Sequence, residues 1–172
     1  EEAGFILPIE KWVLDEACRQ VAAWRNEIAP SLILSVNVSR SNFRNPDLIK
    51  VVQSALNDSG LPADALTIEI TETVLIEDSE QVIQRLNELS DMGVRLALDD
   101  FGTGYSSFGY LKRFRVNAVK IDQTFIKDII SNSVDLALVD AIISMSNKLD
   151  LAVVAEGVET PEPLALLRSI GC

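Results

Sequence analysis

Hydrophobic positions along the chain follow a helical period in some segments and a strand-like pattern in others. Between residues 8 and 28 apolar residues recur every three or four positions, which predicts an amphipathic helix with Trp12 and Trp24 in the core. Further helices are predicted at residues 45–60, 79–91, 108–114, 134–149 and 160–171. Short apolar runs predict five strands, at residues 32–39, 66–72, 94–98, 117–122 and 152–159. The chain therefore reads as a leading helix followed by five strand–helix units.

Regular alternation of strands and helices without hairpin signals is typical of an α/β protein with a parallel sheet. The carboxyl ends of parallel strands lie along one edge of such a sheet, and α/β proteins build their sites at that edge. We therefore expect polar residues near the carboxyl ends of these strands to come together.

Every predicted strand carries a polar residue toward its carboxyl end. These residues are Asn37, Glu69, Asp99, Lys120 and Glu156, each about one strand–helix unit after the previous one. At the central strand, Asp99 and Asp100 are adjacent and a loop with two glycines follows. Adjacent carboxylates at a buried strand end repel each other and lose hydration, and a divalent cation with oxygen ligands would neutralise them. A solvated Asp-Asp turn is the simpler explanation, but it does not account for the repetition on five strands.

Composition narrows the chemistry. With 172 residues the chain is about one domain, and its hydrophobic content of 48% is enough for a sizeable core. The net charge of -11 argues against binding to a nucleic-acid polymer or to an anionic membrane surface. There is no histidine, which excludes His-based triads, His-ligated zinc and imidazole acid–base catalysis. Any metal must be bound through oxygen, which favours Mg²⁺ or Mn²⁺.

The two cysteines, Cys18 and Cys172, have no metal-ligand spacing and suggest no disulfide framework. We expect Cys18 to be a small buried apolar residue within the first helix. Charges interrupt the longest apolar stretches, so we expect no membrane span.

Five segments, in this order, resemble the EAL-domain family of cyclic di-GMP phosphodiesterases. They are Ser-Val-Asn-Val-Ser at 35–39, Glu-Ile-Thr-Glu at 69–72, Asp-Asp-Phe-Gly-Thr-Gly-Tyr-Ser-Ser at 99–107, Lys-Ile-Asp at 120–122 and Glu-Gly-Val-Glu at 156–159. The resemblance implies an α/β fold, a modified (β/α)8 barrel of TIM type. About five parallel strands with their covering helices are present, so residues 1–172 would be a partial EAL phosphodiesterase domain.

Two parts of the family pattern are absent: the Glu-Ala-Leu strand, whose glutamate is a metal ligand, and the last strand. If these parts are truly absent, we expect an open or partner-completed sheet, an incomplete barrel, with impaired metal binding and impaired activity in the chain by itself. A calorimetric Mg²⁺ titration that shows two tight sites on this chain would contradict that expectation.

The resemblance also implies roles for individual residues. Asn37, Glu69 and Asp99 would hold one Mg²⁺ or Mn²⁺, and Asp99 with Asp100 would hold a second ion beside Asp122. Lys120 and Glu156 would position and activate the attacking water, with Glu156 as the base. Glu72 would stabilise the loop after the two aspartates, and Glu159 would lie behind the metal ligands or near the substrate.

Simpler explanations exist for four of these residues. Asn37 can cap a strand end, and Lys120 can extend its ammonium to solvent. Glu72 and Glu159 can be ordinary surface acids.

The implied activity is metal-dependent hydrolysis of cyclic di-GMP to linear pGpG in the intact parent protein. Two divalent ions can clamp the attacking and leaving oxygens of such a displacement. The alternatives are a catalytically inactive receptor or protein-interaction module with the same fold, and an unrelated magnesium-dependent barrel enzyme. The resemblance further implies a homodimer formed through the loop after Asp100 and fusion to signalling domains such as a GGDEF or sensor domain. It implies a cytoplasmic domain, whose parent is either free in the cytosol or tethered to a membrane elsewhere.

Overall fold

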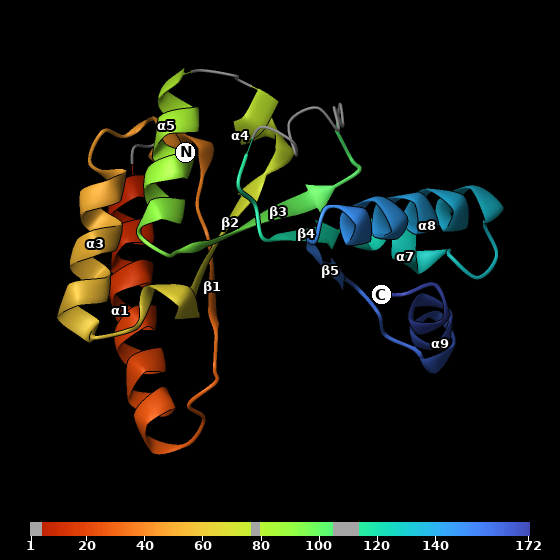
Figure 1. Cartoon of the computed structure of the whole chain (residues 1–172), viewed down its shortest axis with the longest axis horizontal. Coiled ribbons are helices and arrows are strands. Elements are labelled where there is room, and N and C mark those ends of the chain that lie inside the picture. The colour runs from red at the N-terminus through yellow and green to blue at the C-terminus, as the bar shows by residue number, and fades with distance from the viewer. Residues whose placement is uncertain (1–4, 77–79, 105–113) are drawn as a thin grey trace.

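The computed structural model describes residues 5–76, 80–104 and 114–172. Five parallel strands form one sheet, and their order in the sheet is their order in the chain (Figure 1). The strands are β1 (Leu34–Asn37), β2 (Leu66–Thr71), β3 (Arg95–Phe101), β4 (Ala118–Ile121) and β5 (Ala152–Ala155). Because right-handed crossovers without a reversal of strand order keep the helices on one face, this topology is of the barrel type rather than doubly wound. The expected fold class is confirmed.

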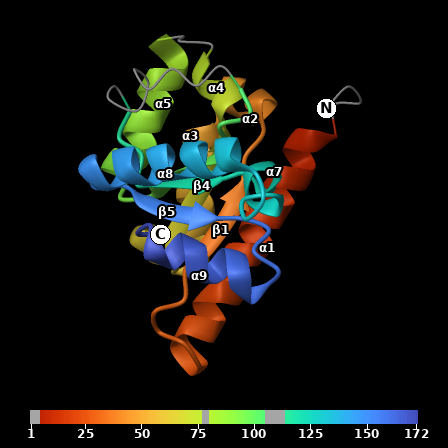
Figure 2. The same ribbon diagram turned by 90° about the vertical axis from the view of Figure 1, so that its right-hand side faces the viewer.

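The helices occupy two groups along this sheet. They are α1 (Ile6–Glu27), α2 (Arg40–Arg44), α3 (Leu48–Ser59), α4 (Glu72–Ile76), α5 (Glu80–Asp91), α7 (Gln123–Lys127), α8 (Ser133–Lys148) and α9 (Pro161–Ser169), with a 3-10 turn at Ala63–Ala65. Helices α1, α3 and α5 lie beside the first strands, whereas α8 lies along β4 and β5 (Figures 1 and 2). Within the described ranges, none is both long and apolar enough to cross a bilayer.

The two faces of the sheet carry different side chains. Ile68 and Leu96 are paired in register and completely buried in the core that the helices cover. The next positions along the same strands, Glu69 and Ala97, are also paired and point to the opposite face because strand side chains alternate. Ala118 continues this row on β4. The face away from the helices is therefore lined with small and polar residues, and these leave room for a site.

The predicted carboxyl ends of all five strands differ from the structure, by two residues in β1 and by one in β4. Strand β2 ends at Thr71, and Glu72 begins α4 instead of ending the strand. Strand β3 continues through both aspartates to Phe101. Strand β5 ends at Ala155, so Glu156 lies in the loop, where Gly157 adopts a left-handed φ of 70°.

Three short helices, α2, α4 and α7, were not predicted. The Ser39 hydroxyl accepts a hydrogen bond from the Asn42 amide (3.3 Å) at the start of α2, and Asp122 accepts one from the Thr124 amide (2.8 Å) at the start of α7. These side chains stabilise the first turns by satisfying backbone N–H groups. Five residues are too few to show a helical hydrophobic period. The helix expected at residues 108–114 lies outside the described residues, except for Phe114.

The prediction that Trp12 and Trp24 lie in the core is wrong. Helix α1 buries Leu14, Cys18, Val21 and Ala22. Trp12 is 66% exposed and Trp24 is 44% exposed. The apolar residues of α1 cover more than one face of the helix. Helix α1 packs against α3 and β1 through the face with the smaller side chains, so that face is buried and the tryptophans are not.

We expect the two thiols to differ in reactivity. Cys18 is completely buried, and burial raises the pKa of its thiol to about 11. Cys172 is an exposed residue, although partial burial of its thiol also raises its pKa. At pH 8 maleimide should label one thiol per native chain and two in urea, as counted by mass spectrometry. Rapid labelling of Cys18 in the native chain would contradict the packing of α1.

Candidate functional site

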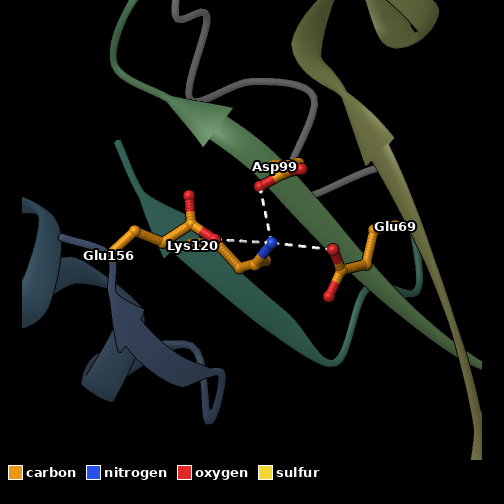
Figure 3. A network of polar contacts seen from close by, with 4 residues as sticks. All are labelled: Glu69, Asp99, Lys120 and Glu156. Carbon is orange, nitrogen blue, oxygen red and sulfur yellow. Dashed lines mark hydrogen bonds and ion pairs between the residues drawn. The ribbon is translucent and has the colours of Figure 1, made fainter. Parts of the chain in front are cut away.

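Lys120 on β4 is the centre of a polar network on the open face of the sheet (Figure 3). Its ammonium donates hydrogen bonds to Glu69 Oε2 at 2.7 Å and to Asp99 Oδ1 at 2.8 Å. It also forms an ion pair with Glu156 Oε1 at 2.7 Å. These contacts raise the pKa of Lys120 above its ordinary value against the opposing effect of burial, so the side chain remains an ammonium.

A β-bulge in β3 brings the two adjacent aspartates to the same site. Leu98 pairs with Val119 and Phe101 pairs with Ile121, so β3 has one residue more than β4 between these pairs. Neighbouring side chains of a regular strand would point to opposite faces. Asp100 instead takes a left-handed φ of 53°, and one of its oxygens lies within 4.8 Å of oxygens of Asp99 and Glu156.

This arrangement fits a hard divalent cation. Asp99, Asp100 and Glu156 form a group, here called the oxygen cluster, in which one carboxylate oxygen of each residue lies within 4.8 Å of one oxygen of each of the others. Oxygen ligands of this kind are those that Mg²⁺ and Mn²⁺ prefer. Glu69 contacts the same lysine, and Asn37 on β1 is the exposed register partner of Glu69.

Asp122 lies beside Asp100 but already has a structural role. One of its oxygens accepts hydrogen bonds from the amide and hydroxyl of Thr124 at the start of α7, and these bonds lower the pKa of Asp122. The pKa of Asp100 is raised mainly by burial and to a smaller extent by the negative charges of Asp99 and Asp122.

Glu72 lies next to the segment that follows the two aspartates. Its Oε1 accepts a hydrogen bond from the Gly102 amide at 2.9 Å, and the Glu72 side chain is buried. A Cβ on Gly104 would lie 2.6 Å from Glu72 Oε2, so Glu72 approaches this backbone as closely as glycine permits. The simpler explanation, an ordinary surface acid, does not hold for Glu72.

Glu159 is not one of the three carboxylates that contact Lys120. It lines a cavity of about 580 Å³ between the residues that follow β4 and those that follow β5, together with Gln123, Lys127 and Gly157. Gln123 and Lys127 were not recognised in the sequence, because they lie on the unpredicted helix α7.

Glu10 is a further residue that the sequence did not reveal. From α1 it accepts hydrogen bonds from the Ser39 amide (3.0 Å) and from Asn42 Nδ2 (2.7 Å). It thereby holds the turn after Asn37 to α1. A lone glutamate in the first turns of an amphipathic helix gives no signal of such a distant contact.

The fold and the site together define an α/β protein of the barrel type with an acidic cluster at the carboxyl edge of its parallel strands. Comparison with known proteins specifies the family: the EAL domain model matches residues 1–172. The chain therefore belongs to the EAL domain family.

Relatives match over the whole chain. It is 43% identical over 172 residues to the oxygen sensor protein DosP of Escherichia coli K12 and 43% identical to the cyclic di-GMP phosphodiesterase NbdA of Pseudomonas aeruginosa. In each case it covers 100% of itself but only 22% of the relative's length.

Solved structures agree with the fold. The c-di-GMP complex of the PaMucR phosphodiesterase matches with a TM-score of 0.95 and 40% identity, over 99% of this chain and 69% of that chain. The EAL domain of Mycobacterium smegmatis DcpA matches with a TM-score of 0.90 and 37% identity, over 96% and 74%.

Proposed function

We propose that this chain is part of a metal-dependent phosphodiesterase that hydrolyses cyclic di-GMP to linear pGpG. The observation that carries the proposal is the gathering of Glu69, Asp99 and Glu156 around one partly buried ammonium, with Asp100 brought alongside by the bulge. Relatives named as cyclic di-GMP phosphodiesterases and a related c-di-GMP complex support the substrate.

Two Mg²⁺ or Mn²⁺ ions are the proposed cofactors. Asn37, Glu69 and Asp99 would hold one ion, and Asp99 with Asp100 would hold the other beside Asp122. When bound, these ions supply positive charge that polarises the scissile phosphodiester and stabilises the charge that develops on its oxygens.

Glu156 and Lys120 are the proposed catalytic residues. The Glu156 side chain is 34% exposed, so water can reach it, and its carboxylate can accept a proton from the attacking water. The water oxygen forms a bond to phosphorus, one ring P–O bond breaks, and the leaving ribose oxygen takes up a proton. Lys120 cannot be the base because its pKa is raised. It holds Glu156 in place and offers positive charge to the phosphate.

The remaining assignments rest on placement beside this site. Glu72 would stabilise the loop after Asp100, through which the chain would form a homodimer. Glu159 would contact the substrate from the cavity it lines. Relatives that include an oxygen sensor protein and a bifunctional diguanylate cyclase/phosphodiesterase support a parent in which this domain is fused to a sensor or GGDEF domain. A cytoplasmic location remains a prediction.

Product analysis tests the proposed function. The protein that contains this chain is incubated with cyclic di-GMP and Mg²⁺, and the nucleotides are separated by chromatography. We expect conversion to the linear dinucleotide. Binding of cyclic di-GMP without conversion would instead identify a receptor.

Replacing Glu72 by alanine should release the segment after the bulge. Loss of the bond from the Gly102 amide to Glu72 Oε1 should increase hydrogen exchange at Gly102 by about fivefold, since one such bond contributes about 1 kcal/mol. Exchange followed by mass spectrometry measures the change. Glu80→Ala, at an exposed position in the first turn of α5, is the matched control. Unchanged protection of Gly102 in Glu72→Ala would contradict the proposed loop-stabilising role.

A further inference from the structure

The ammonium of Lys120 uses all of its hydrogen-bonding capacity within the site. An ammonium has three N–H donors, and Glu69, Asp99 and Glu156 each lie 2.7–2.8 Å from it. The three carboxylates come from β2, β3 and the loop after β5, so a single side chain joins three separate parts of the sheet (Figure 3). The Lys120 side chain is only 13% exposed, and water screens these contacts little.

Two of these carboxylates also belong to the oxygen cluster. Asp99 and Glu156 contact Lys120, and both lie within 4.8 Å of Asp100 through single oxygens. A cation held by the oxygen cluster would therefore share ligands with an ammonium and be repelled by its charge. Lys120 and a divalent ion make competing demands on the same carboxylates.

A lysine is suited to such an exchange. Its charge is compact and lies at the end of a flexible stem, so it can give up one carboxylate and keep another. An arginine would hold its partners through a rigid planar fork and would adapt less readily.

We propose that Lys120 is the internal counter-ion that holds Glu69, Asp99 and Glu156 together when no metal is bound, and that a divalent cation takes over this role. The inference rests on the metal-binding part of the proposed function. It adds that Lys120 makes the fold of the site independent of metal at the cost of weaker metal affinity. In this respect Lys120 is a positioning residue for the carboxylates.

Lys120→Met tests the proposal, because methionine keeps the length of the side chain but removes its charge. Lys50→Met is the matched control, since it makes the same change in net charge at an exposed residue of α3. Both variants are made in the protein that contains this chain and are melted in EDTA and in Mn²⁺, and Mn²⁺ affinity is measured from the electron paramagnetic resonance signal of the unbound ion.

In EDTA we expect Lys120→Met to melt about 10 °C below the wild type, because removing one partner leaves buried carboxylates uncompensated. Mn²⁺ should restore most of this loss, and Mn²⁺ affinity should rise about tenfold because a repelling charge is gone. Lys50→Met should resemble the wild type in both measurements. Lys120→Arg, which retains the charge, should recover part of the stability in EDTA without the gain in affinity.

Two results would overturn the proposal. Equal melting of Lys120→Met and Lys50→Met in EDTA would show that Lys120 is not needed as a counter-ion. A lower melting temperature without any gain in Mn²⁺ affinity would show an ordinary structural ion pair and no exchange. Failure of the proposed metal binding would give a different result, because the wild type and Lys120→Met would both leave Mn²⁺ unbound. The difference in melting temperature between Lys120→Met and Lys50→Met in EDTA would still decide whether Lys120 is a counter-ion.

Discussion

Asp99→Asn is expected to reduce the hydrolysis of cyclic di-GMP by about a thousandfold, since loss of several kcal/mol of transition-state stabilisation corresponds to a change of this size. Asp99 contacts Lys120, belongs to the oxygen cluster and would serve both metal ions. Asparagine keeps the size of the side chain but lacks the negative charge and one acceptor oxygen. The measurement is kcat for formation of the linear dinucleotide at saturating Mg²⁺, in the protein that contains this chain.

Asp64→Asn is the control for this change, because Asp64 is exposed in the 3-10 turn before β2. It should leave kcat within about twofold of the wild type, as is usual for surface substitutions. Circular dichroism confirms that both variants are folded. If Asp99→Asn kept more than a tenth of the wild-type activity, the assignment of Asp99 as a shared ligand would be wrong.

Glu156→Gln should lower kcat by about 10²–10⁴-fold, the usual contribution of a positioned general base. Glutamine cannot accept the proton from water, but it can still accept a hydrogen bond from Lys120. The affinity for cyclic di-GMP, measured by calorimetry in Ca²⁺, should change much less than kcat. The split between binding and turnover distinguishes a base from a residue that only holds the substrate.

Glu162→Gln, in the exposed first turn of α9, is the matched substitution and should retain full activity. Equal loss of binding and turnover in Glu156→Gln would mean that Glu156 contributes to substrate affinity rather than to proton transfer.

The parallel sheet and the residues gathered at its carboxyl edge could be predicted from the sequence. Ile68 and Leu96 on one face and Glu69 on the other follow directly from the alternation of strand side chains. Lys120 and Glu156 were expected toward the carboxyl ends of successive strands. Lys120 lies on β4, Glu156 directly follows β5, and the two side chains are in contact. Placement on a common edge requires only the correct strand order and direction.

The bulge at Asp99 and Asp100 could not be predicted in the same way. Strand periodicity places these two side chains on opposite faces, and only the extra residue in β3 and the left-handed φ of Asp100 bring them together. The sequence suggested a shared role through their chemistry, not through their geometry.

Contacts between segments that are distant in the chain could not be predicted from the sequence either. Glu10 binds the turn after β1, and Gln123 lines a cavity with Glu159. The residues around Glu10 and Gln123 in the sequence give no indication of these contacts. Trp12 was placed in the core because it follows the helical apolar period, but tertiary packing selected another face of α1. In each case the deciding contact lies far away in the chain.

The dependence of turnover on divalent metal tests the central claim most directly. The protein that contains this chain is stripped with EDTA, mixed with cyclic di-GMP and titrated with Mn²⁺ while the linear dinucleotide is measured. We predict no turnover without metal, a rise in rate that saturates with Mn²⁺, and loss of that rise in Asp99→Asn. Turnover that is undiminished after the metal is removed, or cyclic di-GMP that stays intact at every Mn²⁺ concentration, would contradict the account.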